Sequence, residues 1–168
     1  MSAPGPDTAT DPGLDQTMQA RRSRTRPWVW DVPVTIAAGG ALGALARFAV
    51  STAWPHAPGT VPWSTFAINV VGCLLIGALM VVLTEIAGRP HRLIRPFLGV
   101  GILGGFTTFS TYAVEVERLV ADGDPRLALA YLFGTVAAAL IAVQLGVVAA
   151  RLFHRLLVRT HPRKGTSA

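Results

Sequence analysis

The chain has 168 residues, of which 51% are hydrophobic and only 14% are charged, and its mean hydropathy is +0.47. A soluble domain carries charges on about a quarter of its residues. Here they are concentrated between long apolar segments, so a soluble domain is excluded. The net charge of +6 would suit nucleic acid, but there is no folded basic face with interleaved aromatic residues to bind bases. We therefore predict an integral membrane protein that does not bind nucleic acid.

The chain begins with a segment of mixed polar composition. Residues 1–30 combine Pro, Gly, Ser, Thr and Asp with a basic run, which predicts a disordered basic tail. The pair Arg21-Arg22 also occurs in twin-arginine export signals. However, the apolar segment that follows contains Arg47 and has no clear small-residue cleavage site, so we predict that it is retained as a membrane span.

Four apolar segments follow the tail, and each is close to the length of about 20 residues that a membrane-spanning helix needs. They predict an all-α membrane protein whose transmembrane domain covers residues 31–151 and whose cytoplasmic C-terminal tail covers 152–168. The four spans are predicted at about 34–53, 63–84, 97–115 and 127–150.

Basic residues are distributed unequally between the two sides that four spans create. The opposite side of the membrane from the termini carries only Arg118 and Arg126. By the positive-inside rule, the sequence predicts a multi-pass protein of the cell membrane with both termini in the cytoplasm. The side that holds both tails and the second loop carries Arg21, Arg22, Arg24, Arg26, Arg89, Arg92, Arg95, Arg151, Arg155, Arg159, Arg163 and Lys164.

The first span contains closely spaced glycines and one charge. Gly39, Gly40 and Gly43 form a G-x-x-x-G face, which predicts close approach to another helix. Arg47 lies toward the end of the same apolar segment, where a charge is costly. Two interpretations remain open for it: the side chain snorkels to the interface near Trp54, or it faces water and an anion.

The second span poses a similar question at one polar residue. Asn69 offers two amide donors inside the membrane. An interhelical hydrogen bond is one role for it, and a place in an ion path is the other. Gly72 and Gly77 on this span are predicted to allow close helix packing, as in the first span.

The third span carries the most informative stretch, Gly104-Gly105-Phe106-Thr107-Thr108-Phe109-Ser110-Thr111-Tyr112. Glycines and hydroxyls at membrane depth either form a small-residue packing face or face an ion, a substrate or another helix. Gly99, Gly101 and Gly104 also match G-x-G-x-x-G, but that pattern binds dinucleotides only between a strand and a helix. No strand pattern precedes it, so the dinucleotide interpretation is rejected.

The polar groups inside the spans are mostly hydrogen-bond donors. They are Arg47, Asn69, Thr108, Ser110 and Thr111, while no Asp, Glu, Lys or His lies well inside a span. Glu85 and Glu115 lie close to span ends. The ring edge of Phe109 adds a partial positive charge. A site rich in donors and poor in carboxylates favours a path for an anion.

Three ordered motifs resemble the fluoride-channel family called Fluc or CrcB. The resemblance covers about residues 34–150. The motifs are Gly39-Gly40-Ala41-Leu42-Gly43-Ala44-Leu45-Ala46-Arg47-Phe48, then Asn69-Val70-Val71-Gly72, then Gly104-Gly105-Phe106-Thr107-Thr108-Phe109-Ser110-Thr111.

This resemblance implies four-helix subunits that pair antiparallel into a dual-topology dimer with two fluoride pores. It implies a third helix broken near Gly104–Thr107, where the backbone carbonyls of Gly104 and Thr107 hold a structural, non-transported Na⁺ together with their equivalents in the partner chain. It further implies a vestibule at Arg47 and a pore lined by Asn69, Phe109, Tyr112, Ser110, Thr111, Tyr131 and Thr135.

Two positions depart from the family pattern. Tyr112 stands where family members commonly have Phe, which adds a hydroxyl to the aromatic pair. Thr135 is followed one turn later by Ala139, which shortens the hydroxyl track on the fourth span.

The function implied is a passive, fluoride-selective channel that exports cytoplasmic fluoride and lowers its toxicity, and it is not an enzyme. The alternatives are a weakly conducting or non-conducting subunit of a heterodimeric channel and a small four-helix drug transporter. A proton-coupled transporter needs a carboxylate in its first span, and 34–53 has Arg47 instead. The strong charge bias favours pairing with a paralogue of opposite topology over pairing with itself.

Overall fold

The computed structural model describes residues 30–160 except residue 89. Nearly all of the predicted N-terminal tail, and residues 161–168, lie outside the described residues. Within the described residues all regular structure is helical, and four helices are long and apolar enough to cross a bilayer. The prediction of an all-helical protein with four spans is confirmed. The spans are Asp31–Ala53, Trp63–Ile86, Arg95–Ala121 and Pro125–Val158.

Two of the four spans are assembled from several helical segments. The first span is α2 (Asp31–Ala53) and the fourth belongs to α6 (Pro125–Thr160). The second span joins α3 (Trp63–Val81) to η1 (Val82–Ile86), which has wider π-type turns. The third span consists of η2 (Arg95–Leu103), also π-type, α4 (Gly104–Phe106) and α5 (Ser110–Ala121).

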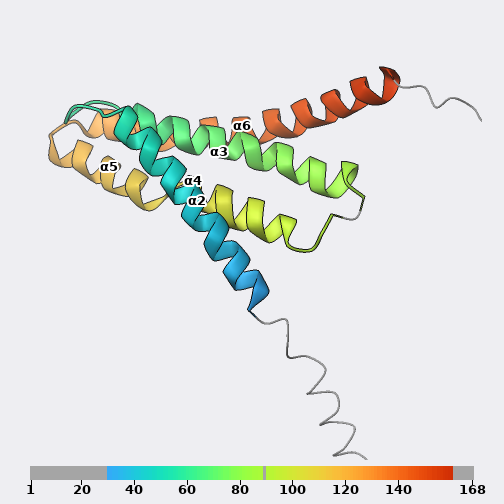
Figure 1. Cartoon of the computed structure of the whole chain (residues 1–168). Helices are drawn as coiled ribbons and strands as arrows, with labels where there is room; N and C mark the ends of the chain where they lie inside the picture. The colour runs from blue at the N-terminus through green and yellow to red at the C-terminus, as the bar shows by residue number, and fades with distance from the viewer. Residues whose placement is uncertain (1–29, 89, 161–168) are drawn as a thin grey trace, which may run out of the picture.

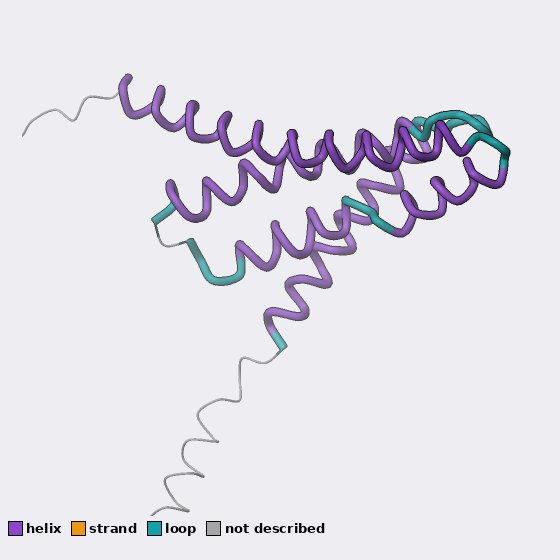
Figure 2. The backbone as a smooth tube through the Cα atoms, turned by 180° about the vertical axis from the view of Figure 1, so that it is seen from behind, coloured by secondary structure: helices purple, strands orange, loops and turns teal. Residues whose placement is uncertain are grey.

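The helices pack in pairs. Figures 1 and 2 show α3 and α6 side by side, with α2 crossing the third span obliquely at η2 and α4. The loops at 54–62 and 122–124 lie at one end of the bundle, while the 87–94 loop and the end of α6 lie at the other. An ion pair between Asp31 and Arg92 joins the start of α2 to the 87–94 loop.

Glycines bring α2 against the third span. A Cβ atom on Gly39 would overlap the Phe97 carbonyl oxygen, and one on Gly43 would overlap the carbonyl of Ile102. The contact is reciprocal, because a Cβ on Gly105 would overlap the backbone of Gly40. The predicted close approach at the G-x-x-x-G face is therefore confirmed, and its partner is the third span.

The second and fourth spans approach each other in the same way. A Cβ on Gly77 would overlap the backbone of Val143, and one on Gly146 would overlap the backbone of Leu74. Gly72 instead faces the side chain of Thr107. The absence of a side chain at Gly72 therefore makes room for the third span at the point where its helix is interrupted.

The third span is broken, but not where its glycines lie. Gly104 is helical, with φ −66° and ψ −37°, and helical geometry continues to Phe106. Thr107 is extended, with φ −74° and ψ 157°, and helix resumes only at Ser110. The predicted break near Gly104–Thr107 is thus displaced to Thr107–Phe109. The backbone freedom of Gly104 is not what opens the helix.

The fourth helix is longer than predicted. The predicted span ends at 150 and the predicted tail begins at 152, but α6 continues to Thr160. Residues 151–160 contain neither Gly nor Pro, and the first proline after the span is Pro162, so nothing in the local sequence ends the helix earlier. Arg151 also binds Glu85 at the end of the second span, through contacts of 2.6 and 3.1 Å.

Candidate functional site

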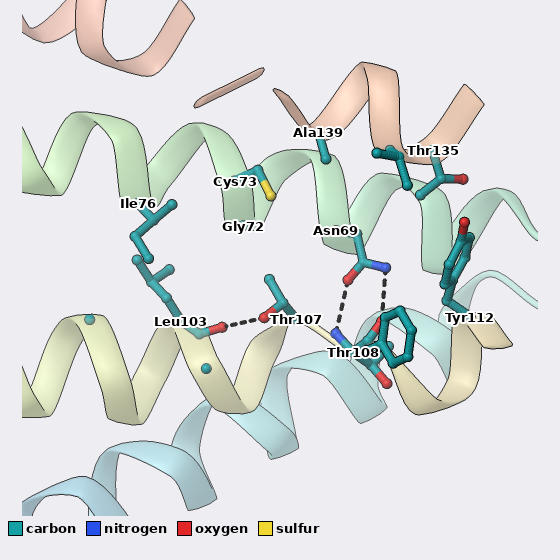
Figure 3. Close-up of a pocket in the computed structure, with 14 residues that line it drawn as sticks. Asn69, Gly72, Cys73, Ile76, Leu103, Thr107, Thr108, Tyr112, Thr135 and Ala139 are labelled. Atoms are coloured by element: carbon teal, nitrogen blue, oxygen red, sulfur yellow. Dashed lines mark hydrogen bonds between the residues drawn. The ribbon is translucent and has the colours of Figure 1, made fainter. Parts of the chain in front are cut away.

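The interruption of the third helix leaves backbone polar groups that need partners inside the membrane. Asn69 on α3 supplies two of them, as Figure 3 shows. The Thr108 N–H donates to the Asn69 Oδ1 at 2.8 Å, and the Asn69 Nδ2 donates to the Thr108 carbonyl at 2.9 Å. This reciprocal pair satisfies both backbone groups of Thr108. Of the two roles that the sequence left open for Asn69, the interhelical hydrogen bond is therefore present, and one amide hydrogen remains for another acceptor.

Arg47 on α2 also binds a backbone group next to the break. Its Nε donates to the carbonyl oxygen of Gly105 at 3.1 Å. This carbonyl has lost its helical partner because residue 109 lies in the interruption. Arg47 therefore joins α2 to α4, and its guanidinium retains four other N–H groups.

A cavity of about 330 Å³ lies beside the break, between the second, third and fourth spans (Figure 3). Of the predicted site residues, it brings together Asn69, Gly104, Thr107, Phe109, Tyr112 and Thr135. Ala139, the residue that shortens the hydroxyl track, also lines it. The remaining wall is formed by small and apolar residues, including Gly72 and Cys73. The cavity is thus apolar with a few convergent polar groups, as small-ligand sites usually are.

Two backbone carbonyls at the cavity have lost their helical partners. No N–H group in the described part of the chain donates to the carbonyl oxygen of Gly104 or of Thr107. The N–H of Thr108, which would bind the Gly104 carbonyl in a continuous helix, binds Asn69 instead. The space where a Gly104 side chain would lie is open in the single chain. These oxygens are therefore available to a cation or to donors from outside the chain.

Three aromatic rings run in sequence from the cavity. The Phe109 and Tyr112 ring centroids are 6.0 Å apart, and those of Tyr112 and Tyr131 are 5.4 Å apart. Phe109 is 80% exposed in the single chain, whereas Tyr112 and Tyr131 are buried. The Tyr112 hydroxyl donates to the Leu132 carbonyl on α6 at 2.6 Å. The hydroxyl that Tyr112 has and a Phe would lack therefore links α5 to α6 by a hydrogen bond.

Thr135 places a buried hydroxyl at the cavity wall. Its side chain is 4% exposed, and its Oγ1 makes no hydrogen bond within the described residues. An unpaired buried hydroxyl costs about 1–3 kcal/mol. A water molecule or an ion bound to this hydroxyl would offset that cost.

Ser110 and Thr111 lie away from this cavity. They line a separate hollow of about 270 Å³ together with Glu115 and Arg118. The Thr111 hydroxyl accepts from the Thr108 hydroxyl at 3.0 Å. Tyr131 faces a third hollow, which it shares with Thr135. The predicted pore residues therefore fall into separate groups, and Thr135 lines both the cavity beside the break and the hollow at Tyr131.

Glu115 is not among the predicted site residues, because it lies close to the predicted end of the span. Its side chain is only 5% exposed, and it accepts from the Thr65 hydroxyl at 2.7 Å and from the Tyr131 hydroxyl at 2.8 Å. Helical spacing contains the missing signal, since 108, 111, 112 and 115 fall on one face of a helix. In this arrangement both hydroxyl hydrogens point toward the carboxylate, so neither donates to a passing anion.

The sequence matches a known family over most of the membrane domain. Residues 34–147 match the family described as "CrcB-like protein, Camphor Resistance (CrcB)". The chain belongs to the CrcB-like family. All three motifs quoted above fall inside the matched region, as does every residue discussed at the cavity.

Individual CrcB-like relatives are similar over nearly their whole length. The "Fluoride-specific ion channel FluC 2" of Nocardia farcinica is 58% identical over 70% of this chain and 84% of that protein. The "Fluoride-specific ion channel FluC 1" of Streptomyces coelicolor is 55% identical over 74% of this chain and 81% of that protein. The "Fluoride-specific ion channel FluC 2" of Streptomyces avermitilis is 50% identical over 80% of this chain and 85% of that protein.

Proposed function

We propose that this chain is a subunit of a fluoride-specific ion channel that lets cytoplasmic fluoride leave the cell and so reduces its toxicity. The observation that carries this proposal is the identity of 50–58% to relatives named as fluoride-specific channels. The chain is a passive conductor and not an enzyme, as its family is one of ion channels. Membership of this family also removes the reason for considering a small drug transporter.

The cavity supplies the chemistry that fluoride needs. Fluoride is small and strongly hydrated, so only closely placed donors replace its water. The free amide hydrogen of Asn69, the unpaired hydroxyl of Thr135 and the ring edges of Phe109 and Tyr112 are such donors. The Asn69 amide is held by its hydrogen bonds with Thr108, and Tyr112 and Thr135 lie on helices. A larger, more weakly hydrated chloride ion gains less from them, which supports selectivity for fluoride.

A second subunit is part of this proposal, with the two chains antiparallel. One chain leaves Phe109 80% exposed and the cavity open on one side, so a single copy does not enclose a path for an ion. The paired chain would close it and would provide a second pore by symmetry. Ser110 and Thr111 would continue the polar track, and Arg47 would attract anions at a vestibule.

The free carbonyls fit a structural Na⁺ at the dimer axis. Gly104 and Thr107 each offer a hard oxygen atom that accepts no hydrogen bond from residues 30–160, and unwound backbone carbonyls bind Na⁺ in other membrane proteins with broken helices. Two oxygens do not complete a coordination shell, so the partner chain would supply the others. The ion would hold the two chains together and raise the local potential for anions.

Removal of Na⁺ tests that site. When Na⁺ is replaced by N-methylglucamine in detergent, the fraction of dimer measured by light scattering should fall, and it should recover when Na⁺ is returned. The same exchange between K⁺ and N-methylglucamine is the control and should leave the fraction of dimer unchanged. A dimer fraction that is the same with and without Na⁺ contradicts a structural sodium.

The identity of the second chain follows from the charge bias. A self-pairing antiparallel dimer requires insertion in both orientations, which a strong Lys/Arg bias opposes. Streptomyces avermitilis has at least two relatives of this chain, named FluC 2 and FluC 3, so paralogues occur together in one organism. We therefore expect termini in the cytoplasm and a partner of opposite topology. Reporters fused to each terminus measure the orientation of the chain in the membrane. Equal populations of both orientations would contradict the expectation of a paralogous partner.

Fluoride efflux from liposomes, read with an electrode, tests the function. The purified chain is reconstituted alone and together with a paralogue, with chloride efflux as the control. Fluoride release without chloride release is the expected result for the chain together with a paralogue. The same release by the chain alone would establish a self-sufficient channel and overturn the expected pairing with a paralogue. Phe109→Ile in this chain only should reduce the release from the mixed channel if this chain lines a pore. An unchanged release would favour the alternative of a non-conducting partner subunit.

Tyr112 is expected to act through its ring. Tyr112→Phe keeps the ring and removes a hydroxyl that donates to Leu132, so fluoride efflux should stay within about threefold of the unmodified channel, with a stability loss of about 1 kcal/mol. Tyr112→Ile removes the ring edge and should reduce efflux about fivefold or more, because an aromatic contribution of about 1 kcal/mol or more is lost. Equal losses for the two variants would place the hydroxyl itself in the ion path.

A further inference from the structure

The end of α6 extends beyond the membrane core. The helix has 36 residues, which corresponds to about 54 Å, whereas the hydrocarbon core is about 30 Å thick. Its sequence contains no charged residue between Arg126 and Arg151. Residues 127–150 therefore fill the core, and 151–160 emerge at the level of the lipid headgroups. Figure 1 shows this end of α6 running past the end of α3.

The emerging segment has two different faces. Arg151, His154 and Arg155 follow the helical spacing i, i+3 and i+4, so they share one face. Leu152 and Phe153 lie on the other face and are 52% and 65% exposed. Basic side chains beside exposed apolar ones suit the end of a spanning helix at the headgroup level, where the apolar side chains face acyl chains and the basic ones face headgroups.

A hollow of about 380 Å³ lies at the basic face, between α6 and η1. It is lined by Val81, Glu85, Ile86, Arg151, His154 and Arg155. The Glu85 carboxylate binds the Arg151 guanidinium through both oxygens, so these two charges compensate each other. Within residues 30–160 neither Arg155 nor His154 forms an ion pair, so these two side chains can bind an anion from outside, while Val81 and Ile86 offer an apolar wall.

We propose that this hollow is a binding site for an anionic phospholipid. The lipid phosphate pairs with Arg155 and accepts from His154, and an acyl chain lies along Val81 and Ile86. The apolar face at Leu152 and Phe153 rests at the boundary between headgroups and acyl chains. The charge of the site and its place at the headgroup level select a lipid over a soluble anion. This proposal is independent of fluoride conduction.

Spin-labelled lipids test the site directly. The full-length chain is reconstituted in phosphatidylcholine vesicles with a trace of spin-labelled phosphatidylglycerol or phosphatidylcholine, and the immobilised fraction of each is measured by electron paramagnetic resonance. The unmodified chain should prefer phosphatidylglycerol about fivefold, the contribution expected from one basic residue at a membrane surface. R155Q should lose this preference, and R155K should retain most of it. R126Q, which removes one charge at the opposite end of the helix, is the matched control and should behave like the unmodified chain.

Four outcomes would overturn the proposal. Equal immobilisation of the two lipids by the unmodified chain is the first. A preference that survives in R155Q is the second, because the lipid would then bind at another place on the chain. Displacement of the labelled lipid by inorganic phosphate is the third, since the site would then bind a soluble anion. A change in oligomeric mass in the double variant L152S/F153S is the fourth, because that face would then be an interface with a second copy.

Discussion

Asn69→Asp is expected to reduce fluoride efflux about a thousandfold. The substitution keeps the size of the side chain but replaces the amide donor by an acceptor, so the bond to the Thr108 carbonyl is lost and two oxygens face each other. It also places a negative charge in a cavity that serves an anion. Two like charges about 4 Å apart repel by about 4 kcal/mol at the effective dielectric constant near a protein surface, which corresponds to about a thousandfold in rate.

The measurement is fluoride efflux from liposomes at equal amounts of reconstituted protein. Ala121→Asp is the matched control, because it adds the same charge at the exposed end of α5, beside Asp122 and away from the cavity. It should leave efflux within about twofold, since an exposed charge is screened by salt within about 10 Å. If Asn69→Asp conducts as well as this control, neither the pair of hydrogen bonds between Asn69 and Thr108 nor the free amide hydrogen contributes to conduction.

Gly43→Ala is expected to lower the melting temperature of the channel by about 3–9 °C. A Cβ at this position would overlap the carbonyl oxygen of Ile102 and come within 2.8 Å of the Phe106 nitrogen. Both are backbone atoms on the far side of the interface, so α2 has to move away from the third span. Overpacking of this kind costs about 1–3 kcal/mol, which gives the expected shift in a chain of this size.

Gly40→Ala is the matched control for that experiment. The substitution is the same and the position is three residues earlier, but the nearest atom to the new Cβ is the Gly101 carbonyl oxygen at 4.0 Å, an ordinary contact. Melting of the purified proteins, followed by tryptophan fluorescence in detergent, should show Gly40→Ala within about 2 °C of the unmodified protein. Similar melting temperatures for both variants would mean that α2 and the third span do not pack as closely as the structure has them.

The sequence by itself determined the class of the protein, its four spans and its family. A span depends on the summed hydrophobicity of about 20 consecutive residues, which is a local property. The motifs at Arg47, Asn69 and Gly104 to Thr111 are short and ordered along the chain, so they too are readable without a structure. The same holds for the glycines at 39, 43 and 77, because close helix contact needs small residues at fixed spacing.

Tertiary structure decided what the polar residues contact. Asn69 and Thr108 are 39 positions apart, Arg47 and Gly105 are 58 apart, and Thr65 and Glu115 are 50 apart. No local pattern specifies such pairs, since each depends on how two spans pack and rotate against each other. The position of the break at Thr107–Phe109 also depends on tertiary structure. The Thr108 N–H donates to Asn69 and not to the Gly104 carbonyl, as it would in a continuous helix. Composition therefore determines which helices form, while packing in a medium without water determines which backbone and side-chain groups satisfy one another.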